Sequence, residues 1–159
     1  MTQLQMAIKN RVTGEMKSVA KNEKIKVEEL KKRIAKGLVI IPANKNHENF
    51  KPIGIGAGLK IKINANVGTS PVKSDLKTEL KKLRVALEAG ADTIMDLSTG
   101  GNLDEIRKAL IKNCPVPFGT VPIYQAAIEA KKIEKMTIDR YLQVFEKQAQ
   151  DGVDFATVH

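Results

Sequence analysis

The sequence predicts an α/β fold in which four parallel strands are joined by helical crossovers, preceded by a helical N-terminal segment. Two observations and one rule of chain topology support this fold class. From residue 59 onward, short apolar segments of strand length alternate with longer amphipathic segments of helical period. Glycine, proline or a capping residue separates one segment from the next. A strand, a helix and a second strand in this order form a parallel pair with a right-handed connection.

Residues 1–58 are predicted to form a helical N-terminal segment that ends in an irregular linker. Val27, Leu30 and Ile34 lie on one face of a helix, and Gly37 follows them as a helix stop. The prolines and glycines beyond this point are typical of irregular structure. The expected elements are a helical region over residues 3–36 with a break near 13–14, a short strand or extended run over 38–41, and irregular structure over 42–58.

Residues 59–159 are predicted to form a second domain, in which strands and helices alternate. Ser74 and Thr137 stand where they can cap helices, and leucines follow Ser74 at helical spacing. The prolines at 117 and 122 indicate that the third strand is irregular or kinked. The expected strands are 59–66, 93–97, 116–124 and 153–159, and the expected helices are 74–89, 103–113, 125–133 and 137–150.

Four side chains occupy equivalent places in this alternating pattern. Met95 follows Asn66 by 29 positions, Tyr124 follows Met95 by 29, and His159 follows Tyr124 by 35. Each step is about one strand–loop–helix–loop unit, so the four residues should lie at the carboxyl ends of successive parallel strands. Such ends converge on the ligand site in barrels and in open α/β sheets. Taken singly, Asn66 near a glycine is also ordinary turn chemistry, and Met95 is also ordinary core filling.

The strand count sets an expectation for the complete fold. The last predicted strand stops at His159 without a helix behind it, so the pattern resembles the first half of a (β/α)8 TIM-type barrel. A half-barrel has two open sheet edges and an uncovered interior face. We expect a partner chain, a C-terminal half outside this sequence, or disorder to account for them.

The net charge of +9 is confined to one part of the 159-residue chain. Residues 1–60 hold 13 Lys+Arg and 5 Asp+Glu, which gives +8, while residues 61–159 contribute +1. A basic N-terminal layer could bind phosphates or face an acidic partner. With no Trp and only 4% aromatic residues, the sequence does not favour nucleic-acid binding by base stacking.

Cysteine usage and hydropathy exclude several classes of protein. The single cysteine, Cys114, cannot form an internal disulfide, which suits a reducing cytoplasm. One cysteine also cannot build a cysteine-only metal or cluster site within one chain. No apolar run approaches the roughly 18–20 residues that a transmembrane helix needs, so we expect no membrane span.

Five ordered motifs, which span essentially the whole chain, together resemble the phosphomethylpyrimidine synthase family. Single motifs of this kind are common, but their order and number make the resemblance specific. The motifs are residues 40–47 (IIPANKNH), 62–68 (KINANVG), 91–100 (ADTIMDLSTG), 115–126 (PVPFGTVPIYQA) and 152–159 (GVDFATVH).

The resemblance implies a radical S-adenosylmethionine lyase of thiamine biosynthesis. Enzymes of this family convert 5-aminoimidazole ribotide into hydroxymethylpyrimidine phosphate, using a [4Fe–4S] cluster and S-adenosylmethionine, and they form homodimeric (β/α)8 barrels. The family's substrate-contacting residues at the first four strand ends correspond to Asn66, Met95, Tyr124 and His159. These are the same four positions that the strand spacing selects.

The resemblance also shows what this sequence lacks. The family's later strands supply a phosphate-binding Ser-Arg-Gly-Gly stretch and two zinc-ligand histidines, and its C-terminal tail supplies a Cys-x2-Cys-x4-Cys cluster motif. None of these is found in residues 1–159. We therefore expect no cluster or zinc ligand in this chain and no turnover by it alone. As partners of such a truncated form we expect a second copy in a homodimer or a complementing C-terminal polypeptide.

A second hypothesis belongs to a different class of protein. The chain could be a non-catalytic binding or scaffold module that uses its basic N-terminal surface. Salt-dependent retention on nucleic acid that is lost on deletion of residues 1–36 would favour this alternative.

Overall fold

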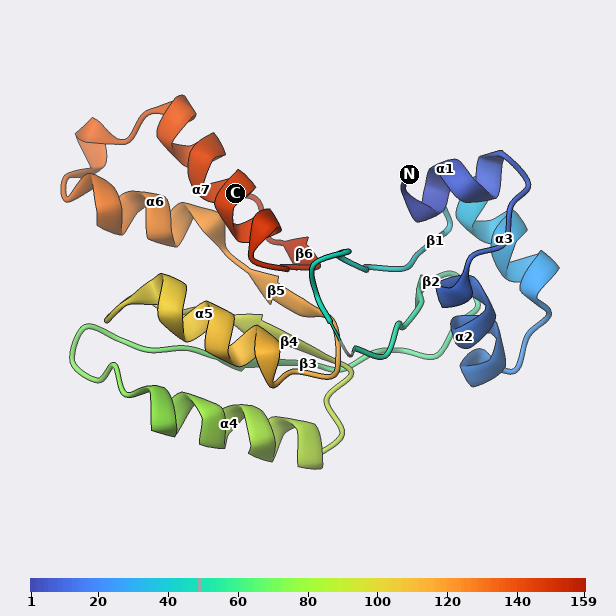
Figure 1. Ribbon diagram of the computed structural model, residues 1–159, viewed down its shortest axis with the longest axis horizontal. Coiled ribbons are helices and arrows are strands. Elements are labelled where there is room, and N and C mark those ends of the chain that lie inside the picture. The colour runs from blue at the N-terminus through green and yellow to red at the C-terminus, as the bar shows by residue number, and fades with distance from the viewer. Residues whose placement is uncertain (49) are drawn as a thin grey trace. The chain divides into compact units, whose positions relative to one another are not determined.

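The computed structural model describes residues 1–48 and 50–159, which form two compact units (Figure 1). The first, here called the helical unit, comprises Met1–Pro42 and Lys51–Lys62. The second, here called the sheet unit, comprises Ala43–Phe50 and Ile63–His159. Each unit is therefore built from two stretches of the chain that are not contiguous in sequence.

The helical unit packs three helices with a two-stranded antiparallel sheet. Its core consists of buried apolar side chains from all three helices and from the first strand, among them Met16, Val19, Leu30, Ile34 and Val39. Burying a side chain of this size contributes about 1.5–3 kcal/mol. The elements are α1 (Gln3–Ile8), α2 (Gly14–Glu23), α3 (Val27–Ala35), β1 (Val39–Ile40) and β2 (Ile55–Gly56).

Two features of the helical unit differ from the sequence expectation. The helical region breaks twice, because Lys24 adopts a left-handed conformation (φ 56°) that ends α2, in addition to the break before Gly14. Strand β2 lies within the segment expected to be irregular. Gly56 (φ 143°) permits its pairing with β1, since a side chain there would overlap the backbone of Leu38.

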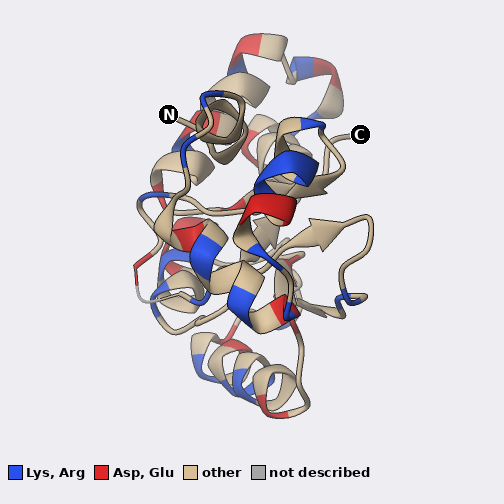
Figure 2. Cartoon of the chain, turned by 90° about the vertical axis from the view of Figure 1, so that its right-hand side faces the viewer, with Lys and Arg blue, Asp and Glu red and all other residues tan. Residues whose placement is uncertain are grey.

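Ion pairs neutralise part of the positive charge of the helical unit. Lys31 contacts Glu28 at 2.6 Å, and Lys62 contacts Glu23 at 2.7 Å. Figure 2 shows Lys and Arg interspersed with Asp and Glu along the helices that face the viewer. The described charges are thus mixed in sign on these helices, which is typical of a solvated helical surface.

The sheet unit has the predicted α/β architecture. Its four strands are all parallel and follow the order β3-β4-β5-β6, as expected for successive strand–helix–strand units (Figure 1). This arrangement is consistent with a partial TIM-type barrel. The strands are β3 (Asn64–Val67), β4 (Thr93–Asp96), β5 (Phe118–Thr120) and β6 (Phe155–Ala156). The helices are α4 (Leu76–Glu88), α5 (Leu103–Lys112), α6 (Pro122–Ala130), the 3-10 turn η1 (Ile133–Lys135) and α7 (Ile138–Gln150).

One apolar cluster holds the strands and helices of the sheet unit together. Phe118 and Ile94 on adjacent strands are fully buried, and Leu83 of α4 and Leu110 of α5 pack into the same cluster. Side chains that alternate with these residues along the strands face the opposite side of the sheet. The helices therefore cover one face of the sheet, and the other face carries the candidate site.

Several element boundaries of the sheet unit differ from the prediction. Strand β3 begins at Asn64 and not at residue 59, and β6 covers only Phe155–Ala156 of the predicted 153–159. Strand β5 ends at Thr120, and Pro122 occupies the first turn of α6, where proline lacks only an amide hydrogen that has no helical partner. Helix α4 is capped by Asp75 and not by Ser74, because the Asp75 carboxylate accepts a hydrogen bond from the Thr78 amide at 2.9 Å.

The short stretch 43–48 is tied to the sheet unit by buried polar contacts. The Nδ1 atom of His47 lies 2.6 Å from a carboxylate oxygen of Asp154, and its Nε2 lies 2.8 Å from the carbonyl oxygen of Cys114. The same carboxylate accepts hydrogen bonds from the amides of Asn44 and Phe118. Asp154 thereby joins this stretch to β5 and to the segment leading into β6.

Candidate functional site

Asn66 and Met95 are direct neighbours across two parallel strands. The register pairs Asn66 of β3 with Met95 of β4, and the same row continues through Gly119 of β5 to Phe155 of β6. Because side chains alternate along a strand, this row lies on the sheet face opposite the helices. Asn66 is exposed and Met95 is half-buried, so both can contact a ligand on this face.

A chain of hydrogen bonds orients the amide of Asn66. The Thr93 hydroxyl donates to Asn64 Oδ1 at 2.8 Å, and Asn64 Nδ2 donates to Asn66 Oδ1 at 2.8 Å. Asn66 therefore uses its amide oxygen as an acceptor within the sheet. Its amide nitrogen, with two hydrogens, remains the group that can donate to a ligand.

Tyr124 and His159 form the second pair of the site. Their rings stack with centroids 6.2 Å apart and an interplanar angle of 20°. The residue spacing predicted Tyr124 at the end of the third strand. Tyr124 instead lies in the first turn of α6, so this part of the prediction is wrong. His159 lies three residues beyond β6. The stacked pair offers a phenol and an imidazole beside each other.

Thr157 links the two pairs. Its hydroxyl lies 3.6 Å from the sulfur of Met95, and it stands two residues before His159 on the same extended segment. The backbone amide of Thr157 also donates to the carbonyl oxygen of Thr120 at 2.9 Å, which holds this segment against β5. The structure thus brings Asn66 and Met95 together, brings Tyr124 and His159 together, and joins the two sets through β6.

Gly119 shapes the floor between the two pairs. The Phe155 ring lies so close to Gly119 that any side chain there would overlap it. The ring therefore packs against Gly119 of the neighbouring strand, in the row that runs from Met95 to β6. This row is suited to contact the flat face of an aromatic ligand.

A buried carboxylate fixes the loop that follows Asn66. Glu79 of α4 is 2% exposed, and its Oε2 accepts a hydrogen bond from the amide of Gly68 at 2.9 Å. Lys82 contacts the other carboxylate oxygen at 2.6 Å and the carbonyl oxygen of Gly68 at 3.0 Å. The Thr69 hydroxyl then donates to the carbonyl oxygen of Gly100 at 2.6 Å, which joins this loop to the loop after β4.

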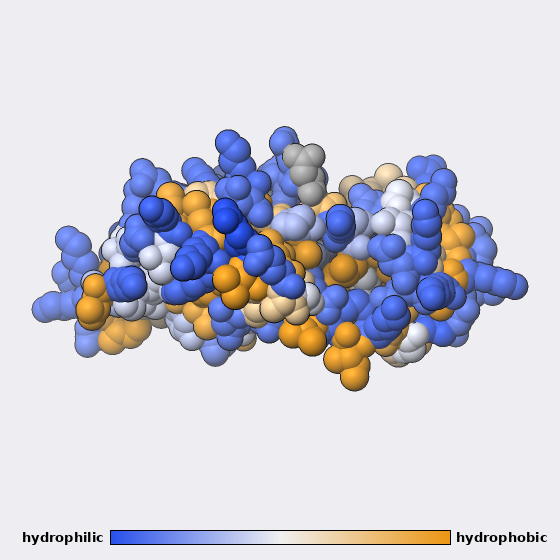
Figure 3. Space-filling view, turned by 90° about the horizontal axis from the view of Figure 1, so that it is seen from below, coloured by the Kyte–Doolittle hydropathy of each residue, from blue (hydrophilic) through white to orange (hydrophobic). Residues whose placement is uncertain are grey.

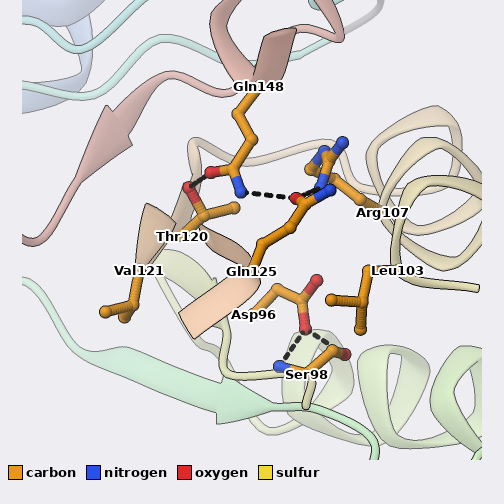
Figure 4. Close-up of a pocket in the computed structure, with 8 residues that line it drawn as sticks. All are labelled: Asp96, Ser98, Leu103, Arg107, Thr120, Val121, Gln125 and Gln148. Carbon is orange, nitrogen blue, oxygen red and sulfur yellow. Dashed lines mark hydrogen bonds between the residues drawn. The ribbon is translucent and has the colours of Figure 1, made fainter. Parts of the chain in front are cut away.

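Behind the strand ends lies a cavity of about 20 Å³ with polar walls (Figure 4). The cavity lies between the sheet and helices α5, α6 and α7, on the side of the sheet opposite the candidate site. Eight residues line it, namely Asp96, Ser98, Leu103, Arg107, Thr120, Val121, Gln125 and Gln148.

Asp96 lies in this wall directly after Met95. Burial raises the pKa of its carboxyl group, while hydrogen bonds from the amide and hydroxyl of Ser98 act in the opposite direction. The positive charge of Arg107 also favours the ionised form. The net effect is a raised pKa for Asp96, because burial outweighs these contacts.

Arg107 is the centre of a network that connects three helices. Its guanidinium, 2% exposed, donates to Gln125 of α6, to Asp151 at the end of α7 and to Asp104 of its own helix. Gln148 of α7 donates to Gln125 at 2.9 Å (Figure 4). A hydrophobic-period pattern assigns such polar positions to the surface, so sequence reasoning missed this network. Thr157 could have been found from its two-residue spacing to His159.

A wide hollow of about 720 Å³ elsewhere on the sheet unit contains none of the four predicted residues. It runs along α4, and its walls include the side chains of Leu76, Leu80, Lys77 and Arg84. Orange hydrophobic areas among the blue hydrophilic surface are visible in the space-filling view (Figure 3). The candidate site is therefore an open sheet face and not this hollow.

Comparison with known proteins identifies the family. A model of the Radical SAM ThiC family matches residues 2–159. The chain belongs to this family. It is 55% identical over 163 residues to a protein of Carboxydothermus hydrogenoformans named phosphomethylpyrimidine synthase. Proteins of the same name from Moorella thermoacetica and Desulforudis audaxviator are each 53% identical over 163 residues. All three alignments cover 100% of this chain and 38% of the relative.

The Radical SAM ThiC chain therefore spans about 38% of the length of these curated relatives. The matched part is their N-terminal portion. The strand-end residues of the first four predicted barrel strands fall within it. The resemblance expected from the five motifs is thus confirmed at the level of the family.

The residues present do not fit the [4Fe–4S] cluster that radical SAM families use. A cluster of this kind is held by several cysteine thiolates, and this chain has one cysteine. Burial raises the pKa of the Cys114 thiol to about 11, and the thiol donates to the carbonyl oxygen of Val116 at 3.2 Å. Cys114 is therefore a buried, protonated side chain, and no reaction step is assigned through a cluster on this chain.

Within residues 1–48 and 50–159, no three His, Cys, Asp or Glu side chains lie close enough together to hold a metal ion. In the same described part of the chain, no helix is both long enough and apolar enough to span a bilayer.

Proposed function

We propose that this member of the Radical SAM ThiC family contributes the N-terminal half of the substrate site of a phosphomethylpyrimidine synthase. In this proposal the chain binds 5-aminoimidazole ribotide in the cytoplasm, as part of thiamine biosynthesis. The observation that carries the proposal is the joining of Asn66, Met95, Tyr124 and His159 on one sheet unit. The shared name of the 53–55% identical relatives supports the choice of substrate.

The chemistry of the four side chains suits a ribotide. The amide nitrogen of Asn66 can donate to a sugar hydroxyl or a phosphate oxygen, and the Tyr124 hydroxyl can donate or accept. The His159 imidazole can act in either role, according to its protonation. Met95 offers a polarizable apolar surface for the flat aminoimidazole ring.

We propose that the complete reaction also needs groups that lie outside residues 1–159. We propose that a complementing C-terminal polypeptide supplies the cluster and zinc ligands, and that it pairs with the open edges of the sheet. A homodimer of the assembled enzyme is compatible with this arrangement. The role of the present chain is then to bind and orient the ribotide against the row from Asn66 to Phe155.

Isothermal titration of the purified chain with 5-aminoimidazole ribotide tests the binding part of the proposal. We expect saturable binding that Asn66→Ala and His159→Ala each weaken at least about tenfold, which corresponds to ~1.4 kcal/mol. Asn22→Ala, on an exposed position of α2, is the matched control and should bind like the parent chain. Absence of binding by the parent chain, or equal affinities for all variants, would contradict the proposal.

Complementation tests the catalytic part. The chain is mixed with the remaining C-terminal portion of the Moorella thermoacetica relative, with S-adenosylmethionine and a reductant. We expect hydroxymethylpyrimidine phosphate only when both polypeptides are present, and less of it with Asn66→Ala. Hydroxymethylpyrimidine phosphate formed by the chain alone would contradict the proposal that the chain needs a partner.

A further inference from the structure

We infer that Arg107 is a positioning residue, whose buried guanidinium sets the Tyr124 ring against the His159 ring. Arg107 touches neither ring. It acts through Gln125, the neighbour of Tyr124, and through Asp151, which precedes the strand that leads to His159. The part of this inference that concerns ligand affinity rests on the proposed function, whereas the part that concerns ring geometry does not.

The guanidinium spans two helices that each lead to one member of the stacked pair. Its Nη1 donates to Gln125 Oε1 at 2.8 Å, which connects α5 to α6. Its Nε and Nη2 donate to one carboxylate oxygen of Asp151, at 3.1 and 2.6 Å, which connects α5 to the end of α7. Because the guanidinium is planar and rigid, it fixes the separation of these two partners.

Gln125 transmits this constraint to Tyr124. Both residues lie in the first turn of α6, so any shift of the Gln125 backbone moves Tyr124 with it. The side-chain nitrogen of Gln125 donates to Asp104 at 2.9 Å and to Glu129 at 2.8 Å. Its oxygen accepts from Arg107 and from Gln148, so Figure 4 shows it held between α5 and α7. The amide is thereby fixed from three directions.

Asp151 transmits the constraint to His159. It is the C-cap of α7, and β6 begins four residues later at Phe155. Gly152 and Val153 follow Asp151 directly. Because Val153 is buried, the short connection from Asp151 to β6 is fixed in position. The segment beyond β6 is then held by the Thr157 amide on Thr120, two residues before His159.

A lysine cannot replace Arg107 in this arrangement. The guanidinium donates four hydrogen bonds to three residues, Gln125, Asp104 and Asp151. The single ammonium group of a lysine lacks the planar fork of donors that reaches all three acceptors together. Hydrogen bonds from Lys147, Gln125 and Arg107 outweigh the effect of burial and lower the pKa of Asp104 to about 2. Asp104 is therefore ionised at neutral pH, and the network keeps its charges.

Proton NMR of the two histidines tests the inference without any ligand. The sequence has only His47 and His159, so each ring gives a separate set of signals. Stacking on Tyr124 should shift the ring protons of His159, and Tyr124→Ala provides the reference for complete loss of this shift. His47, which is buried against Asp154, reports whether the sheet unit is folded.

We expect Arg107→Lys to remove most of the Tyr124-dependent shift of His159 while the His47 signals stay in place. Lys108→Ala is the matched control, because Lys108 also contacts Asp151, at 3.4 Å, but is exposed. It should leave both histidines unchanged. If Arg107→Lys abolishes the His47 signals by unfolding the unit, Gln125→Met is the second variant. It removes the hydrogen bonds of the Gln125 side chain, leaves Arg107 bound to Asp104 and Asp151, and must itself remove the shift. A His159 shift that survives in folded Arg107→Lys or in Gln125→Met overturns the inference.

Ribotide titration adds a second readout. We expect Arg107→Lys to bind about tenfold more weakly than Lys108→Ala, a difference of ~1.4 kcal/mol. Equal affinities of the two variants would contradict the positioning role. If the parent chain binds no ribotide, the proposed function fails, and the histidine signals still decide whether Arg107 sets the pair.

Discussion

The imidazole of His47 and the carboxylate of Asp154 are both fully buried side chains, with Nδ1 and Oδ2 2.6 Å apart. Burial acts to lower the pKa of His47, but the hydrogen bond and charge of Asp154 outweigh it, so the pKa is raised. The carbonyl oxygen of Cys114 accepts from the other ring nitrogen. Both nitrogens thus face acceptors, an arrangement that favours the doubly protonated ring.

This pair predicts a pH-dependent stability of the sheet unit. A raised folded-state pKa means that the contribution of His47 is complete below its unfolded pKa of about 6.5 and is lost as pH rises through the folded value. We expect His47→Gln to cost about 3 kcal/mol at pH 6 and less at pH 9. Both tyrosines lie in the sheet unit, so urea unfolding followed by tyrosine fluorescence measures this unit alone. An equal cost at both pH values would refute the charged pair.

Gly119 predicts a steric limit at the floor of the site. Gly119→Ala should destabilise the sheet unit by about 1–3 kcal/mol, because the added methyl group would overlap the Phe155 ring. Phe155→Leu in the same chain should relieve part of this cost, and a double-mutant cycle by urea unfolding measures the coupling. Additive effects of the two substitutions would show that the ring does not lie over Gly119.

We predict that the charge of Glu79 stabilises the loop that follows Asn66. Glu79→Gln keeps the shape but loses the charge that Gly68 and Lys82 contact, so we expect a loss of about 1.5–3 kcal/mol in unfolding free energy. Glu88→Gln, on an exposed position of the same helix, is the control and should change stability by less than about 0.5 kcal/mol. Indistinguishable unfolding curves for the two variants would rule out this stabilisation.

We predict that the Cys114 thiol of the native chain reacts slowly. Burial raises its pKa to about 11, and the thiolate is the reactive form, so Ellman's reagent should label the native chain slowly at pH 8. In denaturing urea the same thiol should react at once. Fast labelling of the native chain would show that the sheet unit opens readily around the Ile111–Cys114 turn.

The sequence carried enough information to place the parallel strands and most helix starts. Thr137 caps α7 as expected, because a capping side chain acts on amides only two or three residues away. The end of α2 was not predictable in the same way. Lys24 takes a left-handed conformation there without being glycine, so the sequence contains no stop signal at that point.

The candidate site, too, could be predicted from the sequence only in part. The repeat length made Asn66 and Met95 neighbours, because one strand–helix unit advances the register by one strand. Tyr124 was assigned to the wrong element, since Pro122 can end a strand or begin a helix with equal ease. The contacts of Arg107 were out of reach, because its partners Gln125 and Asp151 lie 18 and 44 positions away on other helices.

The way the chain passes between its two units limits how they can be separated by genetic means. Residues 43–48 lie between two stretches of the helical unit, yet His47 and Asn44 contact Asp154 of the sheet unit. A deletion of everything before residue 59 would therefore remove the helices and also strip a buried carboxylate of its imidazole partner. A self-sufficient sheet unit has to retain this short peptide, either through an engineered linker or as a circular permutant.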